Sequence, residues 1–125
     1  MTDHMIDLRG AFLPVVTPFE STTGDVDISG FRENLSSWFG HPISGILIAG
    51  STGESVFLDE RERGILIGAA SDVAPEGTKV IAGTGMESTR HTIHMTKQAA
   101  QAGADAVLVS PPAYFKGAML SLIHI

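Results

Sequence analysis

Four short apolar runs constrain the fold of this chain more than any other feature of its sequence. They lie at residues 12–16, 45–49, 80–83 and 106–109. None of them alternates apolar with polar residues, which predicts strands covered on both faces, as in a parallel sheet. Their spacing of about 30 residues is the size of one strand–helix unit. The sequence therefore predicts an α/β fold of the order βαβαβαβ, with parallel strands and right-handed crossovers.

Amphipathic segments between these runs predict three helices. The first begins after Asp27, a favourable N-cap, and is expected to end at Gly40. Its apolar stripe consists of Ile28, Phe31, Leu35 and Trp38. The third begins after Ser88 or Thr89 and ends at Gly103. It runs through Ile93, Thr96, Ala99 and Ala100.

The second helix has the clearest start signal. Asp59 is followed three residues later by Glu62, a variant of the capping box. The predicted apolar stripe consists of Ile65, Leu66, Ala69, Ala70 and Val73. Gly64 and Gly68 each cost a helix about 1 kcal/mol, and close packing of this helix on the sheet would explain their presence.

Composition excludes several classes of partner. Eight Lys and Arg residues against 14 Asp and Glu residues give a net charge of −6, which argues against nucleic-acid and anionic-membrane surfaces. No apolar run reaches the roughly 20 residues of a membrane span, and residues 1–7 do not resemble a signal peptide. The chain has no cysteine, which rules out disulfides and thiolate metal sites and is consistent with a cytoplasmic location.

The residues that follow each strand are the candidates for chemistry, because ligands of parallel α/β folds bind at the carboxyl ends of the strands. Gly50, Ser51, Thr52 and Gly53 follow the second run. Such a loop can present hydroxyls and backbone N–H groups to a carboxylate or phosphate, although an ordinary turn has the same pattern. Tyr114, the one tyrosine, follows the fourth run and can relay protons or simply pack as an aromatic.

The histidines and lysines give weaker signals. His91 and His94 are three residues apart on the third helix, but no carboxylate joins them at helical spacing, so we predict a solvated face and no metal site. A lysine that forms a Schiff base needs a desolvated pocket. Lys79 precedes the third strand, Lys97 lies in the third helix, and only Lys116 is near the relevant end of the sheet. We interpret Lys116 as an exposed loop residue.

Five segments together resemble the dihydrodipicolinate synthase and N-acetylneuraminate lyase family. They are Leu-Pro-Val-Val-Thr-Pro-Phe at 13–19, Gly-Ile-Leu-Ile-Ala-Gly-Ser-Thr-Gly-Glu-Ser at 45–55, Ala-Gly-Thr-Gly at 82–85, Ala-Gly-Ala-Asp-Ala at 102–106 and Ser-Pro-Pro-Ala-Tyr at 110–114. They occur in the family's order, and the resemblance covers about residues 8–119. The stretch Gly-Ser-Thr-Gly-Glu is the most specific of the five.

The resemblance implies a (β/α)8 barrel and a class I mechanism in which pyruvate or another 2-oxo acid condenses with a lysine. It implies no metal or organic cofactor, and a homo-tetramer or dimer. Ser51 matches a proton-relay hydroxyl, although synthases mostly have threonine there. Thr52 matches the residue that binds the carboxylate, within the substrate-binding loop that includes Gly50 and Gly53. Tyr114 matches the relay tyrosine, which in many members reaches into a neighbouring subunit.

Length limits what this sequence can hold. A (β/α)8 barrel needs about 250 residues, so residues 1–125 are expected to form a partial domain, the N-terminal half of the barrel. The family's Schiff-base lysine lies on the sixth strand, beyond residue 125, so we expect the chain alone to be inactive. Residues 120–125 are almost entirely apolar and are either the start of a further helix or a non-native end.

Some alternatives stay open at this point. Glu87-Ser88-Thr89 and Phe115-Lys116-Gly117 look somewhat like the 4-hydroxy-2-oxoglutarate aldolase branch, whereas 4-hydroxy-tetrahydrodipicolinate synthase is the other candidate activity. The sheet has two unpaired edges, an association hazard, so a non-catalytic half-barrel that self-associates is possible. A complete, small doubly wound domain that binds a phosphorylated ligand at residues 50–53 is the remaining alternative.

Overall fold

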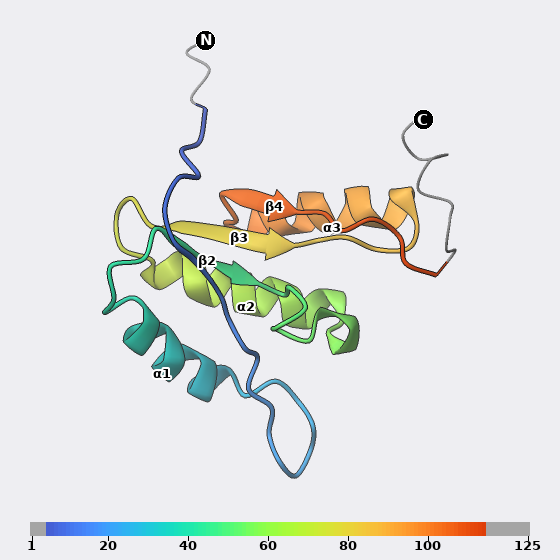
Figure 1. Cartoon of the computed structure of the whole chain (residues 1–125). Coiled ribbons are helices and arrows are strands. Elements are labelled where there is room, and N and C mark those ends of the chain that lie inside the picture. Colours follow the sequence, from blue (N-terminus) through green and yellow to red (C-terminus); the bar gives the residue numbers. More distant parts are fainter. Residues whose placement is uncertain (1–4, 115–125) are drawn as a thin grey trace.

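The computed structural model describes residues 5–114, which form alternating strands and helices (Figure 1). Lys116 and residues 120–125 lie outside this described part. The elements in chain order are β1 (Phe12–Pro14), α1 (Ile28–Trp38), β2 (Gly45–Ile48), the short 3₁₀ helix η1 (Ser55–Phe57), α2 (Glu60–Val73), β3 (Lys79–Gly83), α3 (Thr89–Ala102) and β4 (Ala106–Leu108). None of the described helices is both long and apolar enough to cross a membrane.

The four strands form one parallel sheet in the order β1-β2-β3-β4. Leu47 at the centre of this sheet pairs with Pro14 on one side and Ile81 on the other. The predicted βαβαβαβ order is confirmed. The second strand ends one residue earlier than expected, because Ala49 has a φ of 54° and so leaves the extended region. All strands point the same way, so the loops that follow them lie at one edge of the sheet.

The two faces of the sheet differ, and here the expectation of cover on both faces is wrong. Side chains on one face, including Val15, Ile46 and Val80, are buried and pack with the helices in the main core. The opposite face carries Val16 and Leu108, which are 51% and 52% exposed. Continuous apolar strands predicted a two-sided sheet, but the three described α-helices supply cover for one side only.

Capping follows the sequence signals closely. Asp59 accepts a hydrogen bond from the N–H of Glu62, and the Glu62 carboxylate accepts one from the N–H of Asp59, which completes the predicted capping box. Asp27 caps α1, and Ser88 caps α3. Gly103 ends α3 with a φ of 106°, in the left-handed region that favours glycine.

The buried face of α2 is rotated from the predicted stripe. Leu66, Ala69 and Ala70 are buried as expected, but Ile65 and Val73 are exposed. Ile67 and Arg63 are buried instead, and with Leu66 and Ala70 they follow the helical period. The buried face of α2 was predicted from apolar residues alone, so a buried arginine could not contribute to that prediction.

The reason expected for the glycines of α2 is also wrong. A Cβ atom built on Gly64 would meet no atom within 4 Å, and one on Gly68 would only approach the Ala102 carbonyl oxygen at 4.0 Å. Neither position therefore requires glycine for close packing on the sheet.

Candidate functional site

The loop after β2 turns sharply and presents two hydroxyl-bearing residues to solvent. Ser51 and Thr52 are exposed, whereas Gly50 and Gly53 on either side are buried. The N–H of Gly53 donates to the carbonyl of Gly50 at 3.1 Å, which closes the turn. Both hydroxyl-bearing residues of the predicted loop are therefore accessible to solvent.

The segment that follows β1 holds this loop in place. The hydroxyl of Thr17, which is buried, donates a hydrogen bond to the carbonyl of Gly53 at 2.8 Å. A Cβ atom on Gly53 would lie 3.0 Å from the carbonyl oxygen of Val15. A larger residue would push the loop away from the segment that follows β1, so Gly53 contributes through close packing.

The residues after β3 pack tightly against both neighbouring loops. Thr84 is buried, and its hydroxyl shares a hydrogen bond of 2.9 Å with that of Thr96 on α3. A Cβ atom on Gly83 would lie 2.0 Å from the carbonyl oxygen of Ala49, and one on Gly85 would lie 2.7 Å from the backbone nitrogen of Ser110. Both glycines are therefore required by close approach between strand ends.

Tyr114 lies at the end of the described chain, after β4, and is 79% exposed. Its backbone is held by Glu87, which follows β3. One oxygen of the Glu87 carboxylate accepts from the N–H of Ala113, and the other accepts from the N–H of Tyr114, each at 3.1 Å. The structure thus places Tyr114 on the predicted edge of the sheet, on a segment attached to the β3 loop.

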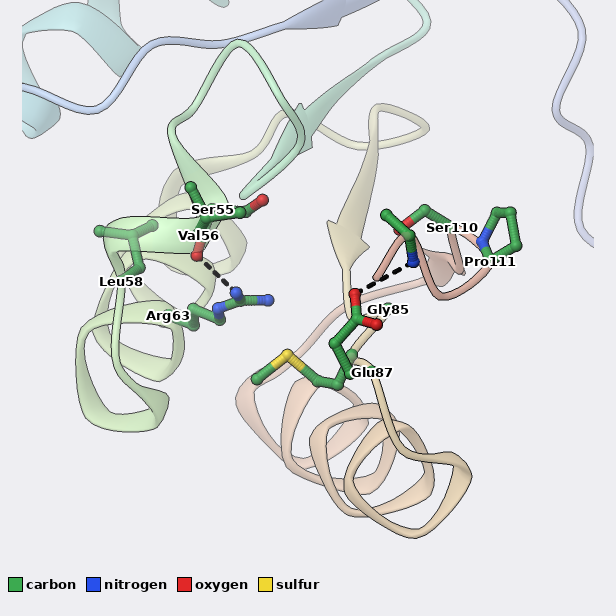
Figure 2. Close-up of a pocket in the computed structure, with 10 residues that line it drawn as sticks. Ser55, Val56, Leu58, Arg63, Gly85, Glu87, Ser110 and Pro111 are labelled. Atoms are coloured by element: carbon green, nitrogen blue, oxygen red, sulfur yellow. Dashed lines mark hydrogen bonds between the residues drawn. The ribbon is translucent and has the colours of Figure 1, made fainter. Parts of the chain in front are cut away.

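A cavity of about 330 Å³ lies between the loops after β2, β3 and β4 (Figure 2). Its lining includes Ser55, Leu58, Arg63, Met86, Glu87 and Ser110. The predicted residues Ser51, Thr52 and Tyr114 are not among the described residues that line it. The cavity therefore adjoins the predicted site at the same sheet edge and is not the site itself.

Arg63 is the buried charge in this cavity wall, and sequence reasoning did not find it. Its side chain is only 4% exposed, and Nη1 and Nη2 donate to the carbonyls of Gly83 and Ser55 at 3.1 and 2.5 Å. The Nε atom is buried without a hydrogen-bond partner in the described structure. Burial lowers the pKa of the guanidinium. The one signal available was its position three residues before Leu66, on the apolar face of α2.

Two histidines share a carboxylate that the sequence did not reveal. Nε2 of His91 and Nε2 of His94 lie 2.9 and 3.0 Å from the two oxygens of Glu60 at the start of α2. The hydrogen bond to His94, followed by that to His91, lowers the pKa of Glu60. All three side chains are partly exposed, and no group in residues 5–114 has the geometry of a metal site. The partner comes from another helix, so spacing along α3 could not have identified it.

Comparison with known proteins identifies the family. The sequence profile described as "Dihydrodipicolinate synthetase family" matches residues 7–124. The chain belongs to the dihydrodipicolinate synthetase family. The predicted resemblance is confirmed, and with it the fold class: the described strands and helices form the N-terminal half of a (β/α)8 barrel.

Individual members of the dihydrodipicolinate synthetase family support this result. A protein of Emericella nidulans named "Probable 4-hydroxy-2-oxoglutarate aldolase, mitochondrial" is 38% identical over 90% of this chain. The 4-hydroxy-tetrahydrodipicolinate synthase of Protochlamydia amoebophila is 38% identical over 87% of it. The crystal structure of dihydrodipicolinate synthase from Aquifex aeolicus superposes with a TM-score of 0.82 and 34% identity over 91% of this chain.

The chain spans little more than a third of the length of these relatives, namely 37%, 36% and 38% respectively. Relatives with two different activities in their names are equally similar in sequence, at 38% identity each. Overall identity therefore does not favour either the aldolase or the synthase branch.

Proposed function

We propose that this chain provides the carboxylate-binding and proton-relay part of a class I aldolase site. The parent reaction acts on pyruvate or a related 2-oxo acid through a lysine imine, as in 4-hydroxy-tetrahydrodipicolinate synthase or 4-hydroxy-2-oxoglutarate aldolase. The observation that carries the proposal is the loop after β2. Its two hydroxyl residues are exposed, and within residues 5–114 the backbone N–H groups of Ser51 and Thr52 make no hydrogen bond.

These donors suit a carboxylate. Two successive N–H groups and the hydroxyl of Thr52 can all donate to one anion, and hydrogen bonds to a charged acceptor are stronger than neutral ones. Gly50 and Gly53 let the turn pack closely, because an added Cβ atom would lie 3.1 Å from Leu47 Cδ2 or 3.0 Å from the carbonyl oxygen of Val15, respectively. Thr52 therefore orients the 2-oxo acid by the carboxylate of that acid. The carbonyl carbon of the 2-oxo acid is left free to react with an amine.

Ser51 and Tyr114 are proposed to move protons. Imine formation eliminates the carbonyl oxygen as water, which requires a proton donor near that oxygen, and hydroxyl groups can pass a proton along a chain. Support for the pairing comes from the sheet topology, because both residues follow parallel strands and lie at the same edge. The proposed reaction needs no metal or organic cofactor. We also propose that the parent protein is a homo-tetramer or dimer and that it is cytoplasmic.

Pyruvate binding to the β2 loop can be tested on the ¹⁵N-labelled chain by nuclear magnetic resonance. We expect pyruvate to shift the amides of Ser51 and Thr52, and Thr52→Ala to weaken binding about tenfold, the effect of losing one charge-assisted hydrogen bond. Thr22→Ala, which removes an exposed hydroxyl elsewhere, should leave the affinity unchanged. Pyruvamide, which lacks the carboxylate, should cause no shift. Equal shifts with pyruvate and pyruvamide would contradict the proposed carboxylate site.

The imine-forming lysine is proposed not to be one of the three lysines in this sequence. Lys97 is exposed, and Lys79 begins β3 at the opposite end of the sheet from the loops. Neither lysine lies in the desolvated pocket that an imine-forming lysine requires. Borohydride reduction in the presence of labelled pyruvate should therefore leave the chain unlabelled. A stable adduct on Lys79, Lys97 or Lys116, located by peptide mass spectrometry, would overturn this assignment.

A further inference from the structure

Glu87 lies in the loop after β3, but its carboxylate bonds to the segment that follows β4. It precedes Ser88, the N-cap of α3, and yet its carboxylate reaches across to the segment that follows β4. Figure 2 shows this carboxylate directed at that segment, away from α3. Its two oxygens accept from the consecutive N–H groups of Ala113 and Tyr114. A carboxylate that holds two adjacent N–H groups fixes the local direction of the chain, because both peptide planes are constrained together.

The sequence after β4 explains why Glu87 bonds to Ala113 and Tyr114. Pro111 and Pro112 have no backbone N–H, so Ala113 and Tyr114 carry the first donors after Ser110. Before the prolines, the loop is pressed against Gly85, where a Cβ atom would lie within 3 Å of three Ser110 atoms. The segment is thus placed by packing on one side of the two prolines and by Glu87 on the other.

We propose that Glu87 is a positioning residue that sets the place of Tyr114 at the sheet edge. This inference rests on the proposed function, in which Tyr114 relays protons. Glu87 acts through the backbone of Tyr114 and has no contact with a reacting atom in this scheme. Arg63, the other charged residue in the cavity wall, bonds to the carbonyls of Gly83 and Ser55 and leaves the Glu87 carboxylate to the two amides.

Amide chemical shifts and amide hydrogen exchange, measured at one pH, test the inference on the full 125-residue chain. Glu87→Gln removes the charged acceptor, so the amide protons of Ala113 and Tyr114 should both shift and should both exchange with solvent about tenfold faster. A residue that only stabilised α3 would instead change the amide of His91, which donates to the Ser88 cap, and would leave Tyr114 unaffected.

Glu76→Gln is the matched control, because it makes the same change at an exposed position in the turn before β3. It should leave the shifts and exchange rates of both amides as they are in the wild type. Unchanged core amides, such as that of Leu66, show that each variant stays folded. If the amides of Ala113 and Tyr114 are the same in Glu87→Gln as in the wild type, Glu87 does not position Tyr114. A different result would contradict the proposed function, namely that pyruvate does not shift the amides of Ser51 and Thr52.

Discussion

Replacing Arg63 by methionine will lower the free energy of unfolding by about 3 kcal/mol, as expected when a buried charged donor leaves its partners unpaired. The guanidinium supplies hydrogen bonds to the carbonyls of Gly83 and Ser55. Methionine fills a similar volume but donates nothing, so the carbonyls at the ends of two loops lose their partner. Removal of the unpaired Nε recovers part of the loss. Urea denaturation followed by circular dichroism measures the change.

Arg61→Met is the control for this experiment. Arg61 lies on the same helix and is exposed, so its replacement makes the same change of charge and of side-chain volume. Its effect should stay within about 0.5 kcal/mol, as for most surface substitutions. If the two variants unfold at the same urea concentration, the cost of burying the Arg63 guanidinium cancels its hydrogen bonds, and it does not hold the loops together.

The contrast between these two arginines shows where sequence reasoning about the fold reached its limit. Within residues 5–114, continuous apolar runs and caps identified each strand and each α-helix, because burial and capping leave local signals. The face of α2 that is buried depended on Arg63, whose acceptors are 8 and 20 residues away in the chain. A polar contact of that kind becomes visible only when the sheet has brought β3 beside β2.

The candidate site divides in the same way. Residues 50–53 could be predicted because glycines and hydroxyls between a strand and a capped helix form a recognisable local pattern. The support of that loop by Thr17 could not, since the contact joins residues 36 positions apart. The same holds for Glu87, whose acceptor role towards Tyr114 spans 27 positions. Sequence reasoning thus found the groups presented at the sheet edge, and the structure adds the side chains that hold them there.

Gly83, at the end of β3, has no room for an added methyl group. Gly83→Ala should destabilise the chain by about 3 kcal/mol, the upper range for overpacking a rigid interior. The new Cβ atom would lie 2.0 Å from the Ala49 carbonyl oxygen and 2.7 Å from its carbon. These are backbone atoms, so relief requires movement of the residue that starts the Gly50–Gly53 loop. Urea denaturation measures the loss, and we expect the pyruvate-induced shifts of Ser51 and Thr52 to disappear with it.

Gly64→Ala makes the same chemical change, but we expect it to stabilise the chain. Gly64 lies in α2 with no atom within 4 Å of its missing Cβ, so alanine should raise the free energy of unfolding by about 0.5 to 1 kcal/mol through its helix propensity. The two variants therefore separate the effect of an added methyl group from the effect of its surroundings. A Gly83→Ala chain as stable as Gly64→Ala, with its pyruvate response intact, would mean that Ala49 moves aside freely. The close approach of β2 and β3 would then have no part in holding the loop.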